Sequence, residues 1–199
     1  MNQEKDLNEL ESLRIISEMM QKVRTDFYDT GISALLWGSV ITFCGLFSFA
    51  GGILAWDFDY FMIWNLTFIA VIPQIWISIR EGKKVKAAPR TDSVAAVWMV
   101  FTLSMFGLIF YNSRQSVIVP SSSSLYLLIY AMPTLTTGLA RQFKPMTIGA
   151  VICYLAFVVS CYTDTTFDML LQAVAAIACW LIPGIILHQR YKRSRIGHV

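Results

Sequence analysis

The sequence predicts an all-α polytopic membrane protein with six transmembrane helices, and two bulk properties indicate this class. Hydrophobic residues make up 56% of the 199 residues and charged residues only 15%, whereas soluble domains carry about 25% charged residues. The apolar residues also fall in long blocks, and a spanning helix needs about 20 of them. We therefore expect a cytoplasmic segment over 1–30, a membrane domain over 31–188 and a basic cytoplasmic tail over 189–199.

Six apolar runs of suitable length follow one another along the chain. They are Gly31–Leu54, Tyr60–Ile79, Ser93–Tyr111, Leu125–Ala140, Met146–Tyr162 and Phe167–Leu187. The fourth run is the shortest. We expect serines 122–124 to extend it, because a serine can cap the first free amides of a helix.

The distribution of basic residues predicts the orientation of these helices. Fifteen of the sixteen Lys and Arg residues fall in segments that would lie on one side of the membrane. These segments are the two chain ends, the loop between the second and third runs, and the loop between the fourth and fifth runs. Only Arg114 falls on the other side. Because cytoplasmic loops are enriched in Lys and Arg, we expect both termini in the cytoplasm.

The even-numbered runs share a pattern that predicts an internal repeat. Each contains an apolar-proline pair with a basic residue seven or eight positions later: Pro73 and Arg80, Pro133 and Arg141, Pro183 and Arg190. The first and third runs share a Trp followed by Gly-Leu. We interpret the chain as three helical hairpins that enter and leave the membrane in the same direction, so the repeat axis would lie along the membrane normal.

The three prolines define a candidate cavity. Each frees the carbonyl four residues earlier, and such a group must be satisfied by neighbouring helices, hydroxyls or water. One hypothesis is a small polar cavity where the kinks converge, lined by Pro73, Gln74, Pro133, Thr134 and Pro183. The alternative is that the prolines only bend the helices for packing.

The spacing of apolar side chains over residues 7–28 predicts an amphipathic cytoplasmic helix. Its apolar stripe is a candidate partner-binding surface, formed by Leu13, Ile16, Met20, Val23 and Phe27 at spacings of three and four. Helices that bind anionic lipid are rich in Lys and Arg, whereas this segment is slightly acidic. We therefore expect it to pack under the bundle, or to pair with a partner protein or a second copy.

No familiar catalytic or cofactor motif is present. The four cysteines have no CxxC spacing, and His188 and His198 have no metal-ligand partner at i+3 or i+4. The predicted spans carry no charged side chain near their centres, where ion-coupled carriers place one. We expect no catalytic residue, cofactor, metal or nucleic-acid partner. The remaining candidates are Asp57, Asp59, Asp164 and Asp168, which could bind a hard cation or form an acidic rim without a site.

Three functions are compatible with these observations. The first is a non-catalytic membrane component that acts through protein contacts, using the N-terminal helix and the basic 80–90 loop. The second is a small carrier or channel for a neutral solute that uses the proline kinks. The third is a membrane enzyme that uses the four aspartates.

The chain resembles a family of small six-helix bacterial inner-membrane proteins to which no function has been assigned. The resemblance rests on "ELESLRIISEMM" before the first run, "LLWG" at 35–38, "KKVK" with "AAVWMVF", "RQFKPMTIGAVICYLAFV" at 141–158 and "WLIPGIIL" at 180–187. It implies the six-helix fold and a location in the bacterial inner membrane. It transfers no functional residue.

Overall fold

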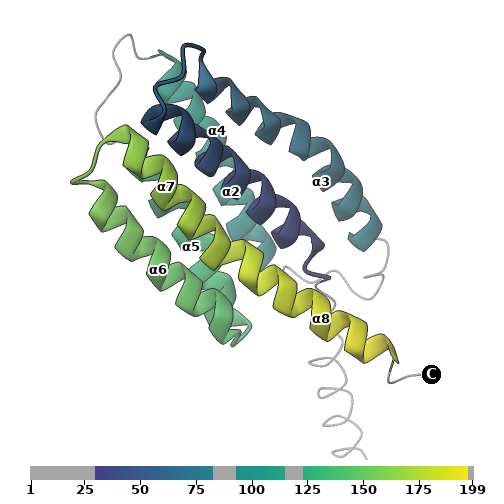
Figure 1. Ribbon diagram of the computed structural model, residues 1–199. Coiled ribbons are helices and arrows are strands. Elements are labelled where there is room, and N and C mark those ends of the chain that lie inside the picture. Colours follow the sequence, from purple (N-terminus) through teal and green to yellow (C-terminus); the bar gives the residue numbers. More distant parts are fainter. Residues whose placement is uncertain (1–29, 83–92, 115–122, 197–199) are drawn as a thin grey trace, which may run out of the picture.

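The computed structural model describes residues 30–82, 93–114 and 123–196, and every regular element in these ranges is a helix (Figure 1). The elements are α2 (Ile32–Ile53), the 3-10 helix η1 (Tyr60–Asn65), α3 (Leu66–Gly82), α4 (Ser93–Arg114), α5 (Ser124–Ala140), α6 (Lys144–Ser160), α7 (Thr165–Ala176), the π-helical segment η2 (Ile177–Leu181) and α8 (Ile182–Ile196). This confirms the all-α class. The N-terminal helix predicted over 7–28 lies outside the described residues.

In the part of the chain that the structure describes, four helices are long and apolar enough to cross a membrane, namely Ile32–Ile53, Tyr60–Glu81, Val94–Arg114 and Thr165–Arg193. The other two, α5 and α6, are apolar and have 17 residues each. At 1.5 Å per residue they are about 25 Å long, which is near the lower limit for a spanning helix. The structure is therefore consistent with the predicted count of six.

The helices form an open arc rather than a closed ring. Neighbours along the arc are α3, α2, the α7–η2–α8 helix, α6, α5 and α4. Within the described ranges, the backbone of α3 approaches only α2 and η1, and the backbone of α4 approaches only α5. Figure 1 shows α3 along one edge of the molecule. The two ends of the arc are thus attached on one side only.

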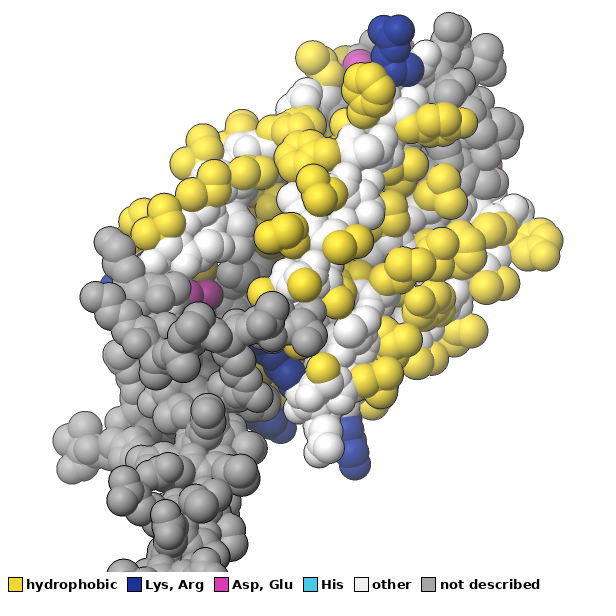
Figure 2. Space-filling model, turned by 180° about the vertical axis from the view of Figure 1, so that it is seen from behind, with side chains coloured by type: hydrophobic (Ala, Val, Ile, Leu, Met, Phe, Trp, Pro, Cys, Tyr) yellow, Lys and Arg dark blue, Asp and Glu magenta, His cyan; other side chains and the backbone are white. Residues whose placement is uncertain are grey.

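The distribution of side chains is that of a membrane protein. Buried positions are rich in small or polar residues such as Cys44, Ala131, Ser160 and Ala173, whereas large apolar side chains such as Ile72 are exposed. Figure 2 shows apolar side chains across the flank that contains α4, with Lys and Arg at its ends. A soluble monomer rarely exposes apolar patches of this extent, whereas a lipid-facing surface requires them. The chain is therefore a membrane protein.

Glycines allow α2 to approach the α7–η2–α8 helix closely. A Cβ on Gly38 would lie 2.7 Å from the Leu181 amide nitrogen, and one on Gly45 would lie 2.7 Å from the Met169 carbonyl oxygen. Small residues allow backbones to pack closely where lipid removes the hydrophobic driving force. The glycines on this face recur every seven positions, from the N-cap Gly31 to Gly38, Gly45 and Gly52 within α2.

The last spanning helix runs from Thr165 to Ile196 and contains one wide turn. The π segment Ile177–Leu181 lies just before Pro183, and the Ile182 amide bonds to the Ile177 carbonyl. A proline ring clashes with the carbonyl four residues earlier in a regular α-helix. A π turn at this point changes that geometry locally, which explains how the helix continues past Pro183.

The short connection between α5 and α6 is built on a left-handed residue. Gln142 has a φ of 49°. The Phe143 amide bonds to the Gly138 carbonyl at 2.8 Å and the Gln142 amide to the Leu139 carbonyl at 3.2 Å. These two bonds form a Schellman motif, which ends a helix and usually places glycine at the left-handed position.

Candidate functional site

A fully buried carboxylate joins three helices at the end of the bundle where α6 turns into α7. Asp168 has 0% exposure. Its Oδ1 accepts hydrogen bonds from the Ser160 hydroxyl at 2.6 Å and the Thr163 hydroxyl at 2.9 Å. Its Oδ2 accepts one from the Ser123 hydroxyl. We refer to these four residues, together with Ser124 and Gln172, as the Asp168 pocket.

Two more buried side chains complete the Asp168 pocket. The Ser124 hydroxyl lies 2.7 Å from the Ser160 hydroxyl. Ser160 already donates to the carboxylate, so Ser124 donates to Ser160. The Gln172 amide nitrogen donates to the Ser123 carbonyl at 3.1 Å. Gln172 lies one turn after Asp168 on α7, and both side chains therefore reach the start of α5.

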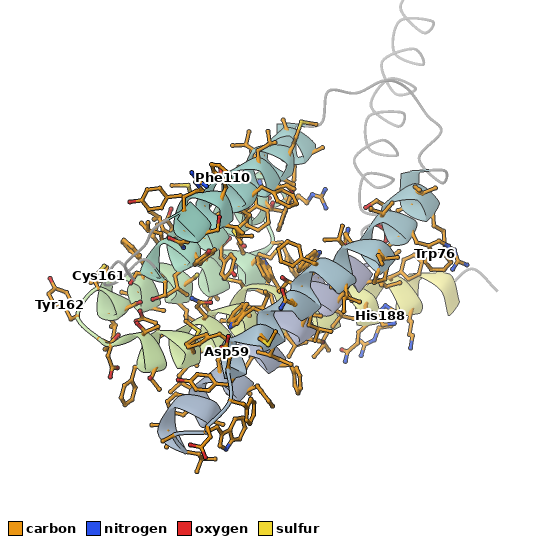
Figure 3. All side chains as sticks on the ribbon, turned by 90° about the horizontal axis from the view of Figure 1, so that it is seen from above. Asp59, Trp76, Phe110, Cys161, Tyr162 and His188 are labelled. Carbon is orange, nitrogen blue, oxygen red and sulfur yellow. The ribbon has the colours of Figure 1, made fainter. Side chains whose placement is uncertain are left out.

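Local sequence explains how these side chains meet. The helix α6 ends at Ser160 and α7 begins after Asp164, whose extended backbone (φ −84°, ψ 165°) forms the N-cap. Asp168 lies in the first turn of α7, and Thr163 lies in the connecting turn. Figure 3 shows Cys161 and Tyr162, in the same turn, at one end of the molecule and His188 towards the other.

The pocket has no positive partner for its carboxylate within the described residues. The side-chain groups that bond to Asp168 are hydroxyls. The N-terminal turn of α7 supplies a favourable dipole, because the amide end of a helix is positive. Burial of a charge is costly unless it is paired or hydrogen-bonded, so the three hydroxyl bonds are essential to this arrangement.

The structure separates Asp168 from the acidic rim that the sequence predicted. Asp57, Asp59 and Asp164 are exposed, and the Asp59 carboxylate caps η1 by accepting the Phe61 amide at 3.1 Å. In the part of the chain that the structure describes, no three His, Cys, Asp or Glu side chains form a metal-binding group. Of the serines predicted to cap the fourth helix, Ser123 acts differently, because its hydroxyl bonds to Asp168 and caps no amide. Ser124 bonds to Ser160, and Ser122 lies outside the described residues.

The candidate cavity residues fall into two groups. Pro73 is exposed on α3, and Gln74 beside it accepts the Trp37 indole N–H at 3.1 Å and donates to Ser33 at 3.2 Å. Pro133 and Thr134 are buried in α5, and Thr134 accepts the Trp180 indole N–H at 3.1 Å. Pro183 is also buried, one turn after Trp180. Thr134 on α5 is thus joined to Trp180 in η2, whereas the backbone of α8, which carries Pro183, does not approach α5, and α3 is not a neighbour of either helix within the described ranges.

Indole hydrogen bonds recur between helices of this bundle. In the first two hairpins, a Trp on the first helix donates to the second: Trp37 to Gln74, and Trp98 to Thr137 at 3.1 Å. Trp64 donates to Ser48 at 3.0 Å. Sequence analysis found the Trp repeat but not the acceptors, which lie next to the proline or one turn after it.

A shallow apolar pocket of about 290 Å³ lies between α4 and α5. Its walls are formed by Ala96, Val97, Val100, Phe101, Ser104, Ile129, Met132 and Pro133. Of the predicted cavity residues it includes only Pro133, and its lining is almost entirely apolar. Whether the proline-flanking residues line a solute cavity stays a prediction.

The predicted partner-binding stripe from Leu13 to Phe27 lies outside the described residues, so it also stays a prediction. Comparisons of this chain with protein-family models, with curated proteins and with solved structures find no match to any of them.

Proposed function

We propose that this chain is a non-catalytic component of a membrane that acts through protein contacts, and that one contact surface is the outer face of α4. The observation that carries the proposal is Gly107. Nine glycines have described surroundings, and at eight of them an added Cβ would meet another part of the chain. At Gly107 the added Cβ would meet nothing within 4 Å among the residues that the structure describes.

A glycine inside a helix is unfavourable by about 0.5–1 kcal/mol relative to alanine. At the other helix interfaces of this protein that cost is offset by close packing, as at Gly38 against Leu181. Gly107 has no such compensation within the described residues. A transmembrane helix from another polypeptide, packed against α4, would supply it.

The surroundings of Gly107 support the same interpretation. Ser104 is exposed one turn earlier, and it also borders the pocket between α4 and α5. Leu103 and Phe110 are 66% and 68% exposed. Within the described ranges α4 has only α5 as a backbone neighbour. Most of its surface is therefore available to a partner helix, and the pocket offers space for an inserted side chain.

The topology forms part of the proposal. The basic asymmetry supports a cytoplasmic location for both termini, and the resemblance of the sequence to small six-helix inner-membrane proteins supports a location in a bacterial inner membrane. The two Trp bonds from α2 to α3 and from α4 to α5 support a repeated hairpin. The N-terminal amphipathic helix and the basic 80–90 loop would provide further partner contacts on the cytoplasmic side.

Site-specific photo-crosslinking in the native membrane tests the α4 surface. A photoreactive amino acid at position 107 should give a protein adduct, whereas the same group at Leu155, which is 62% exposed on α6, should react only with lipid. An adduct of twice the 22.5 kDa chain mass would identify a second copy, and another mass would identify a different protein. If position 107 gives only lipid adducts, α4 has no partner and the proposal fails.

A further inference from the structure

We propose that the Asp168 pocket binds a small monovalent cation, with sodium as the ligand of choice. The proposal is independent of the partner surface on α4. It rests on a cluster of oxygen atoms around a single buried negative charge, and each part of that cluster is supplied by a different element: the start of α5, the end of α6, the connecting turn and the first turn of α7.

The donor atoms fit a hard cation. Within the pocket the carboxylate of Asp168 is accompanied by the hydroxyls of Ser123, Ser124, Ser160 and Thr163, which are linked to it directly or through Ser160. Oxygen ligands are those that hard cations prefer. A hydroxyl has two lone pairs besides its proton. The same side chains that donate to the carboxylate can therefore rotate and coordinate a cation.

The charge of the Asp168 pocket indicates the charge of the cation that it can bind. Asp168 is the only charged residue that contributes a side chain to it within the described ranges. One carboxylate with neutral oxygens balances a single positive charge. Calcium sites usually contain several carboxylates, and thiolate or imidazole ligands, which transition metals prefer, are not among the pocket residues. The composition therefore matches a monovalent cation.

Burial provides the second argument. Asp168 is 0% exposed, Ser124 is 1% exposed and Ser160 is 0% exposed. A buried carboxylate without a positive partner is unfavourable in a membrane protein, and such residues mark ion or proton sites. Elsewhere in the described chain the buried hydroxyls of Thr134 and Thr137 are satisfied by backbone carbonyls one turn earlier. Among the described residues, only the Asp168 pocket brings three hydroxyls to one carboxylate, with a fourth linked through Ser160.

The test is the thermal unfolding of the purified full-length protein in detergent, titrated with NaCl against choline chloride at constant ionic strength. Binding to the folded state should raise Tm by about 3–6 °C for each tenfold increase of sodium above Kd, for a chain of this size. Asp168→Asn should abolish the increase. The matched control is Asp164→Asn, one turn earlier and exposed, which should retain it.

A second variant keeps the proposal testable if Asp168→Asn does not fold. Thr163→Val removes one hydroxyl from the partly buried side of the pocket and should shift the sodium titration to at least tenfold higher concentration. The proposal is overturned if sodium does not change Tm, or if Asp168→Asn responds like the unmodified chain. It is also overturned if micromolar calcium replaces sodium, or if acid alone produces the stabilisation, because a proton would then be the ligand. Failure of this test leaves the crosslinking at position 107 unaffected.

Discussion

The close approach of α2 to the last spanning helix can be tested by adding one carbon atom at Gly38. In Gly38→Ala the new Cβ would lie 2.7 Å from the Leu181 nitrogen and 3.0 Å from its Cα, whereas ordinary contact begins at 3.4 Å. Both opposing atoms belong to a helix backbone and cannot rotate away. The helices must therefore separate, and overpacking of this kind costs about 1–3 kcal/mol.

Alanine also favours the helix by about 1 kcal/mol relative to glycine, so we expect a net loss of up to about 2 kcal/mol for Gly38→Ala. Gly107→Ala is the matched control, because no described residue would lie within 4 Å of its new Cβ. It should gain up to about 1 kcal/mol. Both variants would be measured by circular dichroism during thermal unfolding in detergent, where 1 kcal/mol corresponds to about 2–4 °C. Equal stability changes for the two variants would refute the packing argument.

Three further substitutions test local features by the same measurement. Gln142→Gly should stabilise the chain by up to about 1 kcal/mol, because glycine adopts a positive φ without strain; an unchanged or lower Tm would contradict this. Gln74→Leu should cost about 0.6–1.7 kcal/mol, since it leaves the Trp37 indole without an acceptor, and a neutral result would argue against that bond. Trp98→Phe should cost about 0.6 kcal/mol, because the bond to Thr137 is lost while an aromatic ring is kept; a loss above about 3 kcal/mol would indicate a packing role instead.

The sequence was sufficient to predict the class and the positions of the spanning helices. The run expected over Gly31–Leu54 corresponds to α2 at Ile32–Ile53, and the run over Leu125–Ala140 corresponds to α5 at Ser124–Ala140. Helices in a bilayer satisfy their own backbone, so continuous apolar length is a strong signal. It locates each helix and carries no information about which helices are neighbours.

Asp168 illustrates the part that could not be predicted. In the sequence it lies near Asp164 in a polar turn and is typical of a solvated rim. Its burial depends on Ser123, which is 45 residues earlier, and on Gln172 reaching the same serine. The available signal was the concentration of hydroxyl residues at 121–124 and at 160–163. Two such segments at the same end of a bundle, beside an acid on the next helix, favour a shared polar cluster.

Which helices pack against each other in this bundle follows from the properties of the bilayer. Lipid is as apolar as leucine, so an apolar surface has no preference for a helix over lipid. Close backbone approach and interhelical hydrogen bonds provide the preference, as at Gly45 against Met169 and at Trp180 with Thr134. Each of these contacts depends on two residues in different helices. A glycine or an indole in one helix therefore does not identify the neighbouring helix until its partner residue is known. The same reasoning makes Gly107 an indicator of a missing neighbour. Glycine is the residue type found at the close helix contacts of this bundle, and Gly107 has no partner among the described residues.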